Sequence, residues 1–135
     1  MKPVIFLAFI LLHTFQIFAF GDVIDDLSQG MVKCYGKLNE DEATVVSESD
    51  ENDYLKENSP VLNKFYECSF RECGFINGDN KINFHLLRNA LLQDSSISKK
   101  EIDKAIHICK MIKSVNLGDR IVKLLNCLAR NKALH

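Results

Sequence analysis

Five cysteines are the feature that most limits how this chain can fold, because bridged cysteines fix which segments lie side by side. Gaps of 33, 4, 35 and 17 residues separate Cys34, Cys68, Cys73, Cys109 and Cys127. This spacing fits neither paired C-x-x-C zinc modules nor a thioredoxin-like redox motif, so we predict no metal site and no cofactor. Spacing alone does not choose among the ways of forming two bridges, and at this level the pairing stays open.

The N-terminal segment over residues 1–21 has the organisation of a secretory signal peptide. Lys2 supplies a positive charge, an apolar run follows, and Ala19 and Gly21 place small residues where signal peptidase requires them. The run is short for a membrane span and three polar residues interrupt it. We therefore expect a secreted, extracellular mature domain over residues 22–135 that does not insert into membranes. Exported thiols are normally bridged, so the cysteines should form disulfides.

Charge is unevenly distributed along the mature chain. Residues 22–57 carry eleven acidic against three basic side chains, whereas residues 99–135 carry nine basic against three acidic ones. No dense basic cluster with interleaved aromatic residues occurs, so nucleic acid is not an expected partner. We interpret these charges as hydrated helix faces, with a basic docking surface as the alternative.

Apolar residues recur at three- and four-residue steps over most of the mature chain, which is the period of an amphipathic helix. No segment of useful length alternates as a strand does. The fold class is therefore predicted to be all-α, a compact bundle of about six helices. Five strong helices are expected, with one or two weak ones in the acidic stretch 39–58; the strong ones cover about 24–38, 60–73, 83–93, 99–115 and 120–128.

Helix starts carry recognisable capping residues. Pro60 suits the first helical position because its missing N–H would have no intrahelical partner there. Ser98 with Glu101 forms the pattern of a capping box. The predicted N-caps are Ser59, Asn83, Ser98 and Asp119.

The text around Cys68, from Phe65 to Phe70 and on through Gly74-Phe75-Ile76 and Lys81-Ile82-Asn83, resembles the third-cysteine helix and turn of the insect odorant-binding proteins. The resemblance extends over essentially the whole mature chain. It is specifically to the reduced-cysteine (C-minus) branch of the pheromone and general odorant-binding family. In that family the first cysteine pairs with the third, the second with the fifth, and the fourth with the sixth.

The resemblance assigns Cys34, Cys68, Cys109 and Cys127 to the first, third, fourth and sixth family positions, with Lys64 and Gly118 where the second and fifth would fall. It thus implies bridges Cys34–Cys68 and Cys109–Cys127, and loss of one whole bridge. We expect the helices bearing the two empty positions to move apart more easily, and a restored cysteine pair to tether them. Cys73 fits no family bridge and is expected to be a buried thiol, with an intermolecular bridge as the alternative.

The resemblance also implies a function, a carrier that binds small hydrophobic ligands such as odorants or pheromones in an internal apolar cavity. The mature chain offers no recognisable catalytic constellation, so we do not expect an enzyme. Tyr35 and Tyr66 are the best hydrogen-bonding candidates. Each wall candidate could equally be ordinary core; the predicted ligand-binding residues are Met31, Tyr35, Leu62, Tyr66, Phe70, Phe84, Leu87, Leu91, Ile106, Met111, Ile121, Leu125 and Leu128.

One alternative to the carrier function remains open at this level. A secreted interaction protein of the same fold, as in venom, saliva or seminal fluid, would act through a charged surface such as the acidic stretch 40–57. A carrier would act as a monomer or weak homodimer, with a membrane chemoreceptor as a candidate partner. The tail over 128–135 is short and could at most close a cavity mouth, so we expect weak pH dependence of binding; His107 is the alternative pH sensor.

Overall fold

The computed structural model describes residues 22–48, 54–93 and 96–134, and the predicted signal segment 1–21 lies outside them. The described residues form helices and connecting turns, as the apolar periodicity predicts, with an isolated antiparallel bridge between Ile76 and Ile82. The fold is all-α. The helices are α2 (Asp22–Tyr35), α3 (Glu40–Ser47), α4 (Pro60–Glu72), α5 (Phe84–Gln93), α6 (Lys99–Cys109) and α7 (Leu117–Arg130).

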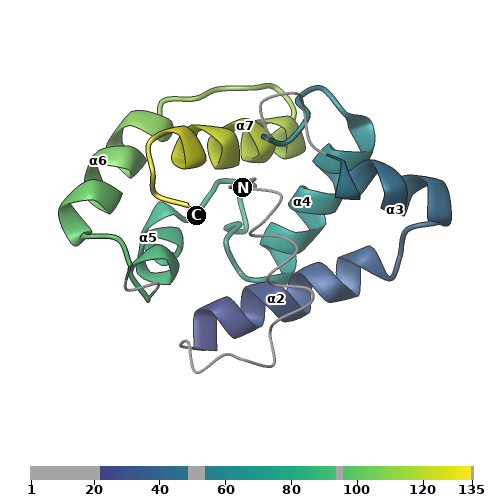
Figure 1. Ribbon diagram of the computed structural model, residues 1–135, viewed down its shortest axis with the longest axis horizontal. Coiled ribbons are helices and arrows are strands. Elements are labelled where there is room, and N and C mark those ends of the chain that lie inside the picture. Colours follow the sequence, from purple (N-terminus) through teal and green to yellow (C-terminus); the bar gives the residue numbers. More distant parts are fainter. Residues whose placement is uncertain (1–21, 49–53, 94–95, 135) are drawn as a thin grey trace.

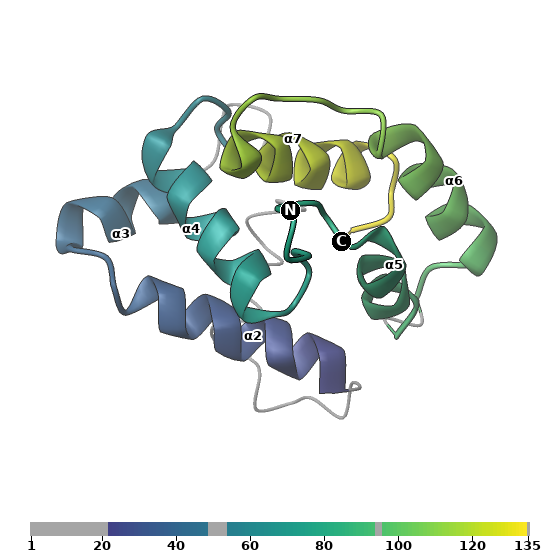
Figure 2. The ribbon, with the colours of Figure 1, turned by 180° about the vertical axis from the view of Figure 1, so that it is seen from behind.

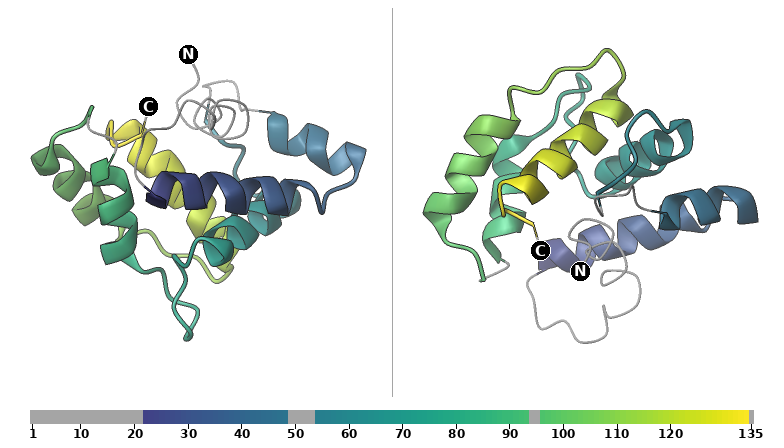
Figure 3. Two further views of the ribbon diagram at one scale, coloured as in Figure 1. Left: turned by 90° about the horizontal axis from the view of Figure 1, so that it is seen from below. Right: turned by 45° about the horizontal axis from the view of Figure 1, so that its top comes forward.

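Helices α4 and α7 form the central pair of the molecule, and the other helices pack around them. Helix α4 packs extensively against α2 on one side and against α7 on the other, while α5 and α6 pair at the opposite end (Figures 1 and 2). The turn that joins α4 to α5 projects from this body (Figure 3). At the α2–α4 contact, Lys33 donates to Glu72 at 3.2 Å. Apolar side chains of α4 and α7 consequently lie at the centre of the core.

Helix starts follow the predicted caps at three positions. Ser59 accepts from the amide of Leu62, with Pro60 at the first position of α4. Asn83 caps α5, and Ser98 accepts from the amide of Glu101 at 3.2 Å. A capping box with both of its hydrogen bonds, between Asn39 and Glu42, starts α3. Helix α3 therefore supplies one short helix in the acidic stretch, where one or two were expected.

The prediction for the α6–α7 connection is wrong in two respects. Helix α6 ends at Cys109 instead of continuing to 115, and Asn116, not Asp119, caps α7 by accepting from the Asp119 amide at 2.9 Å. Arg120 Nε donates to the carbonyl of Ile112 at 2.9 Å. Because that carbonyl would accept an amide four residues later in a continuing helix, this tertiary contact stabilises a loop that apolar periodicity cannot reveal.

Two disulfides join the helices as the family resemblance implies. Cys34–Cys68 links α2 to α4 with a Cα–Cα distance of 6.0 Å, and Cys109–Cys127 links α6 to α7 at 5.7 Å. Their sequence separations of 34 and 18 residues correspond to about 3–4 kcal/mol each in the chain-entropy model. The bridges therefore connect the two outer helices to the central pair.

Cys73 belongs to neither bridge and is half-buried just beyond the end of α4. Its Sγ atom lies against Gly30 of α2, where an added Cβ would stand 3.1 Å away. The small residue at 30 thus lets α2 approach this thiol. Cys73 contributes packing to the α2–α4 contact.

The contact between α4 and α7 is closer than the lost family bridge suggests. Gly118 is buried, and a Cβ added to it would lie 2.7 Å from the Asn63 carbonyl carbon, 2.9 Å from the Asn63 Cα and closer still to the carbonyl oxygen. A real Cβ atom essentially never lies this close to a backbone atom of another segment. Glycine is required here because the two backbones touch, which contradicts the expectation that these helices are loosely associated and that a cysteine at 118 would tether them.

Asn126 is a buried polar residue inside the apolar surface of α7. It is 0% exposed, and its side chain accepts from the Leu55 amide at 2.9 Å and donates to the Leu55 carbonyl at 2.8 Å. It also donates to Glu57 at 3.1 Å. One amide side chain thereby satisfies a buried stretch of backbone that has no helical partners. It attaches the segment before α4 to the middle of α7.

After α7 the chain turns back beneath this helix toward α5 (Figures 1 and 2). Lys132 adopts φ 62°, and the amides of Lys132 and Ala133 donate to the carbonyls of Ala129 and Leu128. This is the Schellman arrangement of a helix C-terminus. It directs Ala133 and Leu134 into the interior, where both are buried.

Candidate ligand-binding site

Twelve of the thirteen predicted ligand-binding residues, carried by five helices, lie in or against one apolar cluster of the described residues. Helix α4 presents three of them, Leu62, Tyr66 and Phe70, at four-residue steps on one face. Tyr35 and Phe84 are half-buried and pack against the cluster. The buried members are Met31, Leu62, Tyr66, Phe70, Leu87, Leu91, Ile106, Ile121, Leu125 and Leu128.

Met111 lies outside this cluster. It is 66% exposed, and neighbouring Val115 is fully exposed. The cause is the early end of α6 at Cys109, which moves Met111 from a helical position into the loop before α7. Its expected role as a cavity wall is therefore not supported by its position.

Several core residues escaped the sequence prediction. Helix α7 is buried on almost every side, so Val122 and Ala129 are core residues in addition to the predicted stripe. Leu55 and Phe75, both in connecting segments, are fully buried. The apolar residues of α7 extend beyond one stripe in the sequence, and that signal could have identified it as the central helix.

The two tyrosines proposed as hydrogen-bonding groups differ in their surroundings. The Tyr35 hydroxyl donates to the Ala43 carbonyl at 3.5 Å, a contact within the protein. The Tyr66 hydroxyl is buried and has no hydrogen-bond partner. Burial raises the pKa of the Tyr66 phenol well above its ordinary value, because the phenolate would lose its hydration. The Tyr66 hydroxyl therefore remains protonated and can donate.

A second buried polar group, Asp119, has partners on one of its two carboxylate oxygens, Oδ2, whereas no hydrogen bond from the described residues reaches Oδ1. Its carboxylate accepts from Lys123 and from Ser114, each at 2.8 Å. The hydrogen bond from Lys123, reinforced by that from Ser114, holds the pKa of Asp119 below its usual value despite burial. On the surface, a hydrogen bond from Arg88 likewise lowers the pKa of Asp103.

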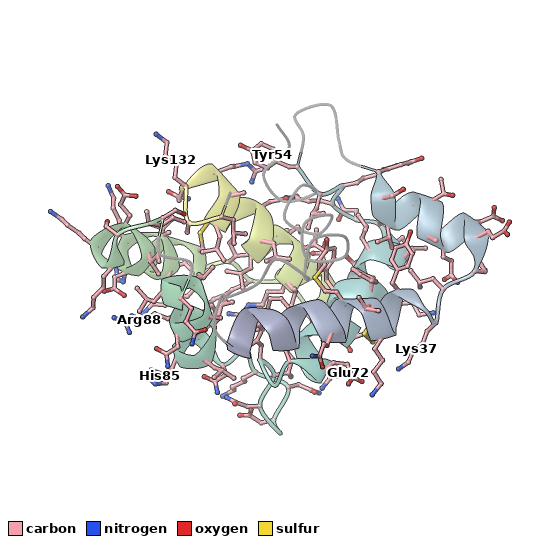
Figure 4. The ribbon with its side chains drawn as sticks, turned by 60° about the horizontal axis from the view of Figure 1, so that its bottom comes forward. Lys37, Tyr54, Glu72, His85, Arg88 and Lys132 are labelled. Atoms are coloured by element: carbon pink, nitrogen blue, oxygen red, sulfur yellow. A yellow bond between two sulfur atoms is a disulfide. The ribbon has the colours of Figure 1, made fainter. Side chains whose placement is uncertain are left out.

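Changing the pH from 7 to 5 is expected to alter ligand affinity and thermal stability very little. His85 and His107 are both exposed, and His85 projects from α5 toward solvent (Figure 4). Because its folded pKa is lowered, Asp119 contributes stability above the ordinary carboxyl pKa of about 3.9, and this is lost as the pH falls through the folded value. Melting curves and ligand titrations at pH 7, 5 and 3.5 test this; a tenfold loss of affinity by pH 5 would refute it.

A separate groove of about 590 Å³ lies on the outer side of α4. Its lining is mainly polar and charged, and none of the thirteen predicted residues belongs to it. Cys68, one of the two cysteines of the Cys34–Cys68 bridge, also lines the groove. The residues around it are Lys37, Pro60, Asn63, Lys64, Glu67, Cys68, Arg71, Glu72 and Asn116.

The helices, their two bridges and the enclosed apolar cluster define a class of small disulfide-stapled, all-α binding domains. The model of the PBP/GOBP family matches residues 22–131, which is most of the chain, and this protein belongs to that family. Members of the family are binding proteins for small hydrophobic ligands. Neither the curated proteins nor the solved structures include a significant match. Over the described ranges, no helix has both the length and the apolarity that crossing a bilayer requires.

Proposed function

We propose that this protein is a secreted, non-catalytic carrier of small hydrophobic molecules, of the odorant or pheromone type. Its ligand would occupy the interior bounded by α2, α4, α5, α6 and α7. The observation that carries the proposal is the buried apolar cluster to which these five helices contribute most of the side chains, in a chain of the PBP/GOBP family. Burial of ligand hydrocarbon would supply about 25 cal/mol per Å² removed from water.

The cysteine pattern supports assignment to the reduced-cysteine branch of the family. Both observed bridges correspond to family bridges, and the two remaining family positions hold Lys64 and Gly118. The backbone contact at Gly118 offers a physical reason why the missing bridge is dispensable. Helices α4 and α7 already pack so closely there that no Cβ fits between Gly118 and the Asn63 backbone. Delivery of the ligand to a membrane chemoreceptor is the downstream step that this assignment suggests.

A titration of the mature protein, residues 22–135, with an environment-sensitive apolar dye tests the carrier function. We expect saturable binding of one dye per chain, followed by displacement with volatile or lipid ligands. Lysozyme, a secreted disulfide-bonded protein with a filled core, provides a control for nonspecific dye binding. Absence of a saturable, competable site would exclude the carrier and favour an interaction protein that acts through its charged surface.

A further inference from the structure

Tyr66 is held rigidly at the middle of the α4 face that the ligand would contact. Leu62 and Phe70 lie one turn to either side of it, and all three side chains are buried. The Phe65 ring meets the Tyr66 ring edge to face, with centroids 4.9 Å apart. The phenol is therefore enclosed by apolar neighbours, and its hydroxyl lies away from solvent.

The hydroxyl of Tyr66 differs from the other buried hydroxyls of the described residues. Ser59 accepts from the Leu62 amide, and Ser69 donates to the Phe65 carbonyl at 2.8 Å. Tyr66 is 4% exposed, and its oxygen has no hydrogen-bond partner within the described part of the chain. Asn63 Oδ1 and Asp119 Oδ1 share this condition, but both are acceptors, so Tyr66 alone of the three can donate. Proteins rarely leave a buried polar atom unsatisfied, because its lost hydration is not replaced, so such an atom in a binding protein calls for an explanation.

The charges near the interior restrict what could satisfy this hydroxyl. Among the described residues that are buried, Asp119 carries the only charge, and its carboxylate is already bonded to Lys123 and Ser114. A carboxylate on a ligand would therefore be desolvated there without a buried cation, and an ammonium group would meet only the Asp119 carboxylate, whose charge Lys123 already balances. The interior suits a neutral molecule.

We propose that Tyr66 donates a hydrogen bond to an oxygen acceptor of the ligand, and that this one hydroxyl makes the site distinguish a ketone, aldehyde or ester from a hydrocarbon of the same length. This inference rests on the carrier function proposed above. It selects Tyr66 over Tyr35, whose hydroxyl donates within the protein. Hydrocarbon of the same length would bind through burial alone and leave the Tyr66 hydroxyl unsatisfied.

Displacement of an apolar dye by a linear methyl ketone and by the alkane of equal chain length tests this inference in three forms of the mature protein. We expect Tyr66→Phe to lower the affinity ratio of ketone to alkane about tenfold relative to wild type, while alkane affinity stays within twofold. Tyr54→Phe, at a tyrosine outside the thirteen predicted residues whose ring lies beside Arg130, should keep the wild-type ratio. Without ligand, Tyr66→Phe should melt at the same temperature as wild type or higher, because it removes an unsatisfied hydroxyl.

Other outcomes separate this inference from the proposed function. If the alkane and the ketone both bind but Tyr66→Phe leaves their ratio unchanged, the role of Tyr66 is overturned and the carrier function stands. A lower melting temperature of unliganded Tyr66→Phe would also overturn it, by showing that the hydroxyl is bonded within the protein. If neither ligand nor dye binds the wild-type protein, the carrier function itself fails.

Discussion

Gly118→Ala is expected to lower the free energy of unfolding by about 4 kcal/mol, a large effect for the addition of one methyl group. The new Cβ would lie 2.7 Å from the Asn63 carbonyl carbon, and backbone cannot rotate away as a side chain can. Helix α7 would therefore have to separate from α4, which loosens the packing at the centre of the core. Denaturant unfolding measures the loss, and the melting temperature should fall by roughly 15 °C.

Gly78→Ala is the matched control, because nothing lies within 4 Å of a Cβ added there. Its stability should change by less than about 0.5 kcal/mol, as for other surface substitutions. A loss below about 1 kcal/mol for Gly118→Ala would show that the α4–α7 contact is not as close as the structure has it.

The same geometry changes the expected result of restoring the missing family bridge. Lys64→Cys combined with Gly118→Cys would add a disulfide but would also place a Cβ against the Asn63 backbone. We expect the oxidised double variant to be less stable than wild type, whereas a sequence argument would have it more stable. A higher melting temperature for the oxidised variant would contradict this account.

Asn126→Ala is expected to cost about 4 kcal/mol, because it removes the side-chain hydrogen bonds to both the amide and the carbonyl of buried Leu55. The segment before α4 should detach from α7, with faster amide exchange at Leu55. Asn89→Ala, which removes a contact on the exposed surface of α5, is the control and should change stability by less than about 0.5 kcal/mol. Similar stability losses in the two variants would contradict the role assigned to Asn126.

Much of this fold is predictable from the sequence because its signals are local. At the start of α4, Ser59 accepts a hydrogen bond from the Leu62 amide and Pro60 supplies a fixed helical φ angle. At the start of α6, Ser98 accepts from the Glu101 amide. The cysteine bridges follow from the family resemblance, which supplied a pairing that spacing could not. These signals depend on neighbours in the sequence or on a pattern shared with relatives.

The features that escaped prediction depend on contacts between distant segments. The end of α6 is stabilised by Arg120, and the role of Asn126 depends on Leu55, which lies 71 residues away in sequence. The need for glycine at 118 arises only when α4 lies against it. No periodicity or propensity in the local sequence contains that information.

The candidate site lies between these two cases. Helical periodicity correctly identified most residues that face inward, because it reports which side of each helix is apolar. It could not separate a ligand-contacting residue from ordinary core, and it misplaced Met111 because the end of α6 was wrong. It also treated Tyr35 and Tyr66 alike, although their hydroxyls differ in whether a protein partner is present.

Methyl-resolved NMR of the mature protein with a neutral lipophilic ketone tests the central claim most directly. An internal carrier site predicts one-to-one binding and intermolecular contacts from the ligand to methyl groups of buried residues on different helices, such as Leu62, Leu87 and Leu125. The exposed methyl groups of Met111 and Val115 serve as internal controls and should not contact the ligand. Contacts confined to these exposed groups, or no contacts at all, would contradict the account.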